Sequence, residues 1–148
     1  MYLISGCLLG HNCKYNGGNN YHRDVVDFCR ERSICVVCPE GVSGLPVPRP
    51  PAEYVQGRIL DREGKDVTEA FERGAALSLE KAIRKAGEVG EEIEGAVLKA
   101  HSPSCGSGQI YDGTFSGTLT CGDGCFTRML KDRGIKVISE KEITNGKF

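Results

Sequence analysis

Short apolar runs that end at a turn are the feature of this 148-residue chain that most constrains its fold. Residues 2–5, 34–37 and 95–99 have the length of buried strands and are too short for buried helices. A turn follows each run, and a cysteine stands in or just beyond that turn. These cysteines are Cys7, Cys38 and Cys105.

Helical patterns separate the apolar runs. Asp24 to Glu31 mixes apolar and charged side chains and predicts a short helix, and 126–133 predicts another that Gly134 ends. A long helix begins near Asp66 or Thr68, either of which can cap it. Its buried face is predicted to carry Phe71, Ala75, Leu79, Ala82, Ile83 and Ala86. A last strand is predicted over 135–138.

Strands that alternate with helices predict the α/β class. We expect a single domain over residues 1–148, with three layers and a mainly parallel, Rossmann-like sheet. Alternation over 55–67 predicts a small β-hairpin insertion with residues 62–65 as its turn. The proline-rich stretch 44–52 predicts a stiff, extended segment, and 106–124 predicts a long irregular loop of the functional kind.

The three turn cysteines are predicted to meet in space. Ligands bind beyond the carboxyl ends of the strands in parallel sheets, and Cys7, Cys38 and Cys105 would each lie at such an end. Three thiolates can hold a metal cluster and leave one metal position free, where a substrate can bind a Lewis acid. The sequence therefore predicts a metal-dependent enzyme.

Composition narrows the setting of this enzyme. The start of the chain lacks the basic residues and long apolar stretch of a signal peptide, so we expect a cytoplasmic protein. In a reducing compartment, eight cysteines favour metal binding over disulfides. No run approaches the roughly 20 apolar residues of a membrane span. A net charge of −1 argues against DNA as a partner and disfavours RNA, which leaves a small neutral substrate.

Five motifs resemble, in the same order, those of the thiouracil desulfidase family. They are Cys7-Leu8-Leu9-Gly10, Cys38-Pro39-Glu40, Gly44-Leu45-Pro46-Val47-Pro48-Arg49-Pro50-Pro51-Ala52-Glu53, Ser102-Pro103-Ser104-Cys105-Gly106 and Tyr111-Asp112-Gly113-Thr114-Phe115-Ser116-Gly117. The resemblance implies a [4Fe-4S] cluster held by Cys7, Cys38 and Cys105, with the fourth iron open. It also implies non-redox removal of sulfur from a small thiolated heterocycle such as 2-thiouracil, with release of sulfide. Cluster-assembly machinery is then an expected partner.

The chain departs from the family pattern at two places. Where the family often has Val-Arg-Tyr-Asp-Gly, this chain has Cys13-Lys14-Tyr15-Asn16-Gly17, so a carboxylate is missing at Asn16. Many members have a serine and an arginine ahead of the last cysteine motif, where this chain has Ala100-His101. Neither a hydroxyl nor a guanidinium is available at those two positions.

Residues near the three cysteines supply candidates for the chemistry. Glu40 lies two residues beyond Cys38, so we expect it to act as the base that activates water, with Glu53 in reserve. The substrate's sulfur is expected to bind the open iron, which prefers sulfur to oxygen. Ser102 is a candidate catalytic hydroxyl beside Cys105. The candidates for substrate binding are Arg49, Ser104, Asp112 and Ser116, with Arg49 alternatively holding the proline-rich segment down.

Several alternatives remain open at this point. A zinc-binding structural module would add His11 or His101 to the three cysteines. Cys35 and Cys38 have the spacing of a thiol-disulfide oxidoreductase. Cys13 could join Cys121 and Cys125 in a second metal site, although these three thiols are more readily explained as core or incidental, and the sequence assigns no role to Cys29. The substrate is open among free thiouracil, another thioamide and a thiolated nucleoside or nucleotide, with thiolated transfer RNA disfavoured by the acidic pI.

Overall fold

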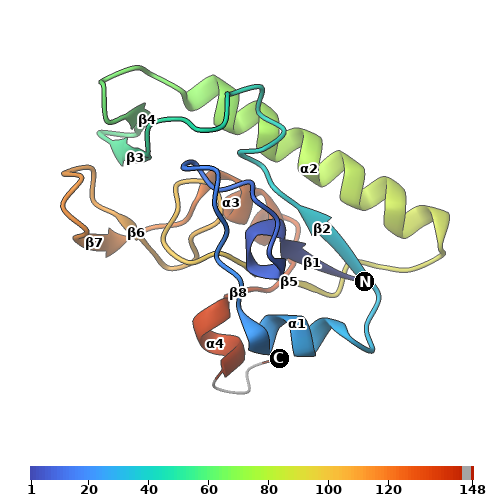
Figure 1. Ribbon diagram of the computed structural model, residues 1–148. Helices are drawn as coiled ribbons and strands as arrows, with labels where there is room; N and C mark the ends of the chain where they lie inside the picture. The colour runs from blue at the N-terminus through green and yellow to red at the C-terminus, as the bar shows by residue number, and fades with distance from the viewer. Residues whose placement is uncertain (145–147) are drawn as a thin grey trace.

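A four-stranded parallel sheet organises the computed structural model, which describes residues 1–144 and 148 (Figure 1). Its strand order is β2 (Ile34–Val37), β1 (Tyr2–Ser5), β5 (Gly95–Leu98) and β8 (Val137–Ser139). These strands confirm the predicted α/β class. The last strand begins two residues later than the sequence pattern predicts.

Helices cover both faces of this sheet and give the predicted three layers. Helices α2 (Thr68–Glu88) and α3 (Cys125–Asp132) cover one face over the larger apolar core. Helices α1 (Arg23–Cys29) and α4 (Glu140–Thr144) lie together on the other face over a smaller core. The sequence pattern did not predict α4, because five residues are too few for a helical period.

The long helix α2 begins and packs largely as predicted. The N-cap position is taken by Val67 rather than by Asp66 or Thr68, and the Asp66 carboxylate, one residue earlier, accepts a hydrogen bond from the backbone N–H of Thr68 at 2.9 Å. The predicted apolar face is buried at Phe71 and partly buried at Leu79, whereas Ile83 is 41% exposed. The inclusion of Ile83 in the core face was wrong, because the sheet below α2 contacts a narrower stripe than the sequence pattern suggests.

The predicted hairpin insertion is present, but its turn lies elsewhere. Strands β3 (Ala52–Val55) and β4 (Arg58–Asp61) pair antiparallel across a turn at Gln56 and Gly57, both with positive φ. The stretch 62–65, predicted as this turn, follows β4 instead. The Asp61 carboxylate builds it by accepting hydrogen bonds from two backbone N–H groups, those of residues 63 and 65.

A second hairpin corrects the prediction for residues 106–124. Strands β6 (Gln109–Tyr111) and β7 (Leu119–Cys121) pair antiparallel within a stretch that was predicted to be irregular. Strands of three residues are too short to show an alternating pattern, so glycine, threonine and serine dominated the prediction.

Two irregular segments run beside each other above the carboxyl edge of the sheet. The segment after β2 carries the proline-rich stretch, and the segment after the short 3₁₀ helix η1 (Gly6–Leu9) leads to α1. The backbone N–H of Arg49 donates to the carbonyl of Tyr15 at 2.7 Å and joins the two segments. None of the helices among the described residues is long and apolar enough to cross a membrane.

Candidate functional site

A cavity of about 530 Å³ opens at the carboxyl edge of the sheet, and four thiols line it. Cys7 comes from η1 directly after β1, and Cys38 follows β2 immediately before Pro39. Cys105 lies in the turn that leads away from β5, and Cys13 comes from the irregular segment after η1. We call this space the thiol cavity. It brings together the three cysteines that sequence reasoning singled out and adds one that it did not.

Burial raises the pKa of two of these thiols above its ordinary value. For Cys105, burial outweighs hydrogen bonds from the hydroxyls of Ser104 and Ser5, and for Cys7 it outweighs a hydrogen bond with Asn20. A buried thiolate needs a compensating cation, and metal ligation supplies one by replacing the proton. The donor set of the cavity therefore fits an iron–sulfur cluster, which binds thiolates.

Cys38 differs from its neighbours because it is supplied with hydrogen-bond donors. The nearby Cys13 thiol and the backbone N–H of Gly41, which donates to the Cys38 sulfur at 3.3 Å, outweigh burial and lower the pKa of Cys38 to about 7, while the pKa of Cys13 is raised. Sequence reasoning missed Cys13, although its position six residues beyond Cys7, within the first motif region, was an available signal.

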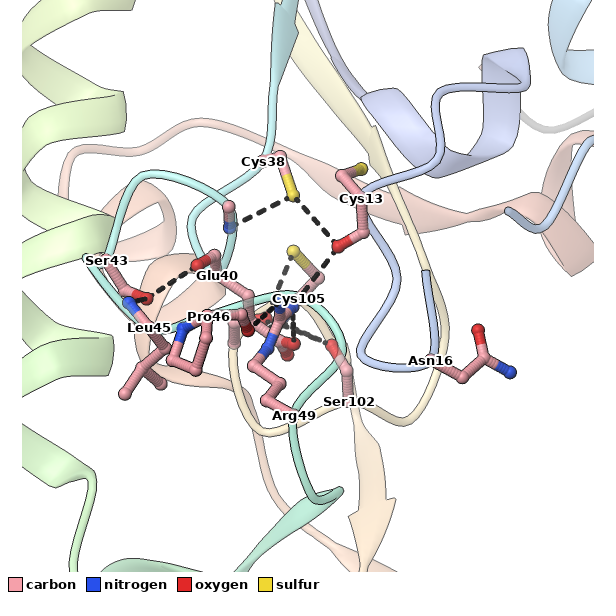
Figure 2. Close-up of polar contacts among 12 residues, drawn as sticks. Cys13, Asn16, Cys38, Glu40, Ser43, Leu45, Pro46, Arg49, Ser102 and Cys105 are labelled. Atoms are coloured by element: carbon pink, nitrogen blue, oxygen red, sulfur yellow. Dashed lines mark hydrogen bonds and ion pairs between the residues drawn. The ribbon is translucent and has the colours of Figure 1, made fainter. Parts of the chain in front are cut away.

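A carboxylate held from both sides stands beside these thiols (Figure 2). One oxygen of Glu40 accepts a hydrogen bond from the Arg49 guanidinium at 2.9 Å, and the other accepts one from the Ser104 hydroxyl at 3.0 Å. The side chain of Arg49 is only 4% exposed, and its Nη2 also donates to the carbonyl of Cys13 at 3.2 Å. Both oxygens of Glu40 are therefore fixed in direction, with 18% of the side chain still exposed.

The hydroxyls of the third cysteine motif continue this network. The Ser102 oxygen accepts a hydrogen bond from the backbone N–H of Cys105 at 2.9 Å and lies 3.3 Å from the Ser104 oxygen. Because the Ser104 proton is directed at Glu40, the Ser102 hydroxyl is the donor that remains for Ser104 or for a ligand. Ser102, Ser104 and Glu40 thus form a continuous chain of proton carriers along the thiol cavity.

Arg49 and Glu53 are both buried at the cavity, and the side chains of both form hydrogen bonds within the protein. The carboxylate that Arg49 binds belongs to Glu40, and the guanidinium also donates to the carbonyl of Pro46 at 3.4 Å, which holds the proline-rich segment down. The carboxylate of Glu53, the reserve candidate for the base, accepts backbone N–H groups of residues 113 and 115, at 2.9 and 3.2 Å, and so supports the β6–β7 loop.

The two remaining candidates for substrate binding lie outside the lining of the cavity. The Asp112 carboxylate accepts hydrogen bonds from the backbone and hydroxyl of Thr114, which lowers the pKa of Asp112. The Ser116 hydroxyl hydrogen-bonds those of Thr114 and Thr118. These contacts stay within the β6–β7 loop, so the structure does not bring Asp112 or Ser116 to the thiols.

A second ion pair, between Lys99 and Glu140, supports the chain just before the third cysteine motif. Lys99 lines the cavity and binds the Glu140 carboxylate at 2.8 Å, and the other oxygen of Glu140 accepts the backbone N–H of Ala100 at 2.8 Å. Burial opposes ionisation of Glu140, but these bonds outweigh it and hold the pKa below its ordinary value. Sequence reasoning missed this pair because 41 residues separate its members.

The donors named by the alternative hypotheses lie apart from one another. Neither His11 nor His101 lines the cavity, and no three His, Cys, Asp or Glu side chains within residues 1–144 and 148 are grouped closely enough for a single metal ion. Cys35 is fully buried in the larger core, which denies it to a thiol-exchange partner. Cys121 is exposed on β7 and Cys125 is buried at the carbonyl of residue 71, so neither joins Cys13.

The side chain of Asn16, where the resemblance showed a missing carboxylate, points away from this network (Figure 2). Its oxygen accepts the backbone N–H of Gly18 at 2.9 Å. The charge that the family often carries at this position is thus not replaced by another contact of Asn16 with the residues around Glu40.

Comparisons with known proteins find similarity over nearly the whole chain. A family model described as 2-thiouracil desulfurase matches residues 2–142. A Bacillus subtilis (strain 168) protein described as uncharacterized protein YbbK is 38% identical over 155 residues, which span 98% of this chain and 99% of that protein. The solved structure of the [4Fe-4S]-dependent thiouracil desulfidase TudS is similar with a TM-score of 0.84 at 38% identity, over 97% of this chain and 93% of that chain.

Proposed function

The chain belongs to the 2-thiouracil desulfurase family, and we propose that it removes sulfur from a thiolated pyrimidine with the help of a [4Fe-4S] cluster. One observation carries the proposal. Three thiols from separate turns line the same cavity as a carboxylate whose two oxygens are oriented by Arg49 and Ser104. The printed name of the similar structure states both the cluster and the activity of that protein.

Cys7, Cys38 and Cys105 are the proposed cluster ligands. When bound, the cluster would supply a soft Lewis-acid iron that attracts the sulfur of a thiocarbonyl and makes its carbon more electrophilic. Buried thiols beside Lys99 and Arg49 suit this role, because nearby cations offset the negative charge of a thiolate-bound cluster. The protein's own residues then have to orient water and move protons.

Glu40 is the proposed base. Its fixed carboxylate takes a proton from a water molecule as the water oxygen forms a bond to the thiocarbonyl carbon. Arg49 acts through Glu40 as a positioning residue, since its guanidinium is buried in the pair with Glu40. Glu53 is the second candidate for the base because it also lines the cavity, with one carboxylate oxygen bound to backbone N–H groups.

Ser104 and Ser102 are proposed to return that proton. It passes from Glu40 to Ser104, from Ser104 to Ser102, and from Ser102 to the departing sulfur, along hydrogen-bonded oxygens 3.0 and 3.3 Å apart. The carbon–sulfur bond breaks as the carbonyl oxygen forms. Water and the thiolated pyrimidine thus give the oxo pyrimidine and hydrogen sulfide, with no net electron transfer.

A combined cofactor and product analysis tests the proposal. Protein purified without oxygen, or reconstituted with iron and sulfide, is expected to be brown with about four iron atoms per chain. With 2-thiouracil it should release sulfide, and in ¹⁸O-labelled water the product should carry the label. A colourless protein with one zinc, or an iron-loaded protein that releases no oxo product, would contradict the proposed function.

Carboxylate variants assign the base. Glu40→Gln is expected to keep the brown colour and lose about 10²–10⁴-fold in turnover. Glu80→Gln is the matched control, because Glu80 is exposed on α2 and away from the cavity. Retained turnover in Glu40→Gln together with a large loss in Glu53→Gln would transfer the role to Glu53.

A further inference from the structure

We infer that Cys13 is a fourth, exchangeable thiolate ligand, which binds the open iron of the cluster until the sulfur of a substrate displaces it. The inference rests on the proposed function, since it concerns the same cluster and the same open position. It assigns a role to a cysteine of the cavity lining that the proposed function leaves without one.

The position of Cys13 carries the inference. Cys13 lines the same cavity as Cys7, Cys38 and Cys105, and its backbone carbonyl accepts a hydrogen bond from the Cys38 thiol at 3.9 Å. A cluster with three cysteine ligands has a single iron left for a fourth. Cys13 is thus a thiol already inside the cavity that would contain that iron, beside one of the proposed ligands.

The backbone of Cys13 is held, while its segment has no regular secondary structure. The Cys13 carbonyl accepts the guanidinium of Arg49 at 3.2 Å and lies 3.9 Å from the sulfur of Cys38 (Figure 2). Beyond Cys13, local hydrogen bonds join Lys14 to Gly17 and Gly18, and the backbone N–H of Arg49 donates to the Tyr15 carbonyl at 2.7 Å. This arrangement keeps Cys13 at the cavity and leaves its half-buried side chain able to change rotamer.

Cys105 shows the contrasting arrangement of a fixed ligand. Its sulfur is buried, its backbone N–H is bound by the Ser102 oxygen, and its carbonyl accepts the Thr127 hydroxyl at 2.8 Å. The residue next to it, Ser104, is buried and bound to Glu40. Such a ligand cannot leave without disturbing the network around the base, whereas Cys13 can.

The exchange involves no electron transfer. The bond between iron and the Cys13 sulfur breaks as the bond between iron and the substrate sulfur forms. The released Cys13 thiolate takes up one proton from solvent and stays in the cavity beside Cys38. In the absence of substrate, the thiolate would protect the fourth iron against loss and against other ligands.

Thiol labelling of the wild-type holoprotein tests the inference. With N-ethylmaleimide in the absence of oxygen, Cys13 should react about tenfold more slowly in the iron-loaded protein than in the apoprotein. Saturating 2-thiouracil should bring its rate back toward the apoprotein value. Exposed Cys121 is the internal control and should react equally in all samples. Mass spectrometry reports each site.

Two results would overturn the inference. Equal labelling of Cys13 in apoprotein and substrate-free holoprotein would show that it is not a ligand, and protection that persists with 2-thiouracil would show that it does not exchange. Iron content and sulfide release are measured on the same samples. Holoprotein without iron, or without sulfide release from 2-thiouracil, would contradict the proposed function. Normal iron content and sulfide release, together with either of the two labelling results above, would contradict only the role of Cys13.

A variant gives an independent readout. Cys13→Ala should bind iron but convert about tenfold faster to a [3Fe-4S] form on oxidation with ferricyanide, as followed by electron paramagnetic resonance. Cys29→Ala, at the end of α1 and outside the cavity lining, is the matched control and should convert at the wild-type rate. Equal conversion in both variants would contradict the inference. Circular dichroism checks folding, and if Cys13→Ala does not fold, wild-type labelling decides.

Discussion

The guanidinium of Arg49 and the carboxylate of Glu40 form a buried ion pair at 2.9 Å, and the same guanidinium nitrogen donates to the carbonyl of Cys13. The proline-rich segment, Glu40 and the backbone of Cys13 are therefore joined through a single side chain. Arg49 also donates to Pro46, so the segment that covers the cavity is fixed to the residue proposed to activate water.

Arg49→Lys should separate positioning from binding. Lysine cannot reproduce the planar set of donors that reaches Glu40, Cys13 and Pro46 together. We expect kcat to fall about ten- to a hundredfold, as for a lost hydrogen bond to a charged group, with little change in KM or iron content. Arg58→Lys is the control, because its ion pair with Asp66 is exposed. A rise in KM with unchanged kcat would assign Arg49 to substrate binding.

Ser104→Ala should slow turnover through the orientation of Glu40. The substitution removes the 3.0 Å hydrogen bond to Glu40 and the link to Ser102. Steady-state kinetics should show a loss of about ten- to a hundredfold in kcat. Ser107→Ala is the control, because that hydroxyl donates to the carbonyl of Val137 at 3.5 Å and takes no part in this network. Unchanged kcat in Ser104→Ala would exclude the proton path through its hydroxyl.

A pair of glycines on α2 tests how the helix supports the Cys38 turn. A Cβ atom at Gly74 would lie 1.9 Å from the carbonyl oxygen of Pro39, whereas one at Gly87 would meet nothing within 4 Å. Gly74→Ala should therefore displace the turn after Cys38 and lower the iron content of reconstituted protein. Gly87→Ala, in the last turn of α2, should keep the iron content and raise the unfolding free energy by at most about 0.5 kcal/mol. Full iron content in Gly74→Ala would contradict this packing.

The ion pair between Lys99 and Glu140 should make stability depend on pH at the acidic end. The pKa of Glu140 is held below its ordinary value, so the stabilisation is complete above about pH 4.3 and disappears as pH falls through the lower folded value. Glu140→Gln should lower unfolding free energy of apoprotein by about 1–3 kcal/mol at neutral pH, with the difference shrinking in acid. Denaturant titrations at several pH values measure it. A constant difference would contradict the role of the Glu140 charge.

The sheet and its helices followed from the sequence because each depends on a local pattern. A few neighbouring residues are enough to predict a buried strand from an apolar run of four residues. The same is true of the start of α2 and of the end of α3, which a glycine marks. Helix α4 and the second hairpin were missed, because elements of three to five residues leave no detectable period. The turn after β3 was misplaced, because residues 56–57 and 62–65 each contain one glycine and the sequence alone does not say which of the two joins the strands.

The site was only partly predictable for a different physical reason. Cys7, Cys38 and Cys105 could be grouped because parallel strands end at a common edge. Two ion pairs could not be predicted in this way, that of Arg49 with Glu40 and that of Lys99 with Glu140. They depend on how irregular segments fold over that edge, and irregular segments have no periodic sequence pattern. For the same reason, Cys13 was not placed in the cavity.

The most direct test of the account is the iron and sulfide content of single cysteine variants after anaerobic reconstitution. Replacement of Cys7, Cys38 or Cys105 by serine should each abolish a stable [4Fe-4S] spectrum and sulfide release from 2-thiouracil. Cys35→Ser and Cys121→Ser should keep both, because their side chains lie outside the cavity lining. A full cluster in any of the first three variants, or loss of the cluster in both controls with the fold intact, would contradict the central claim.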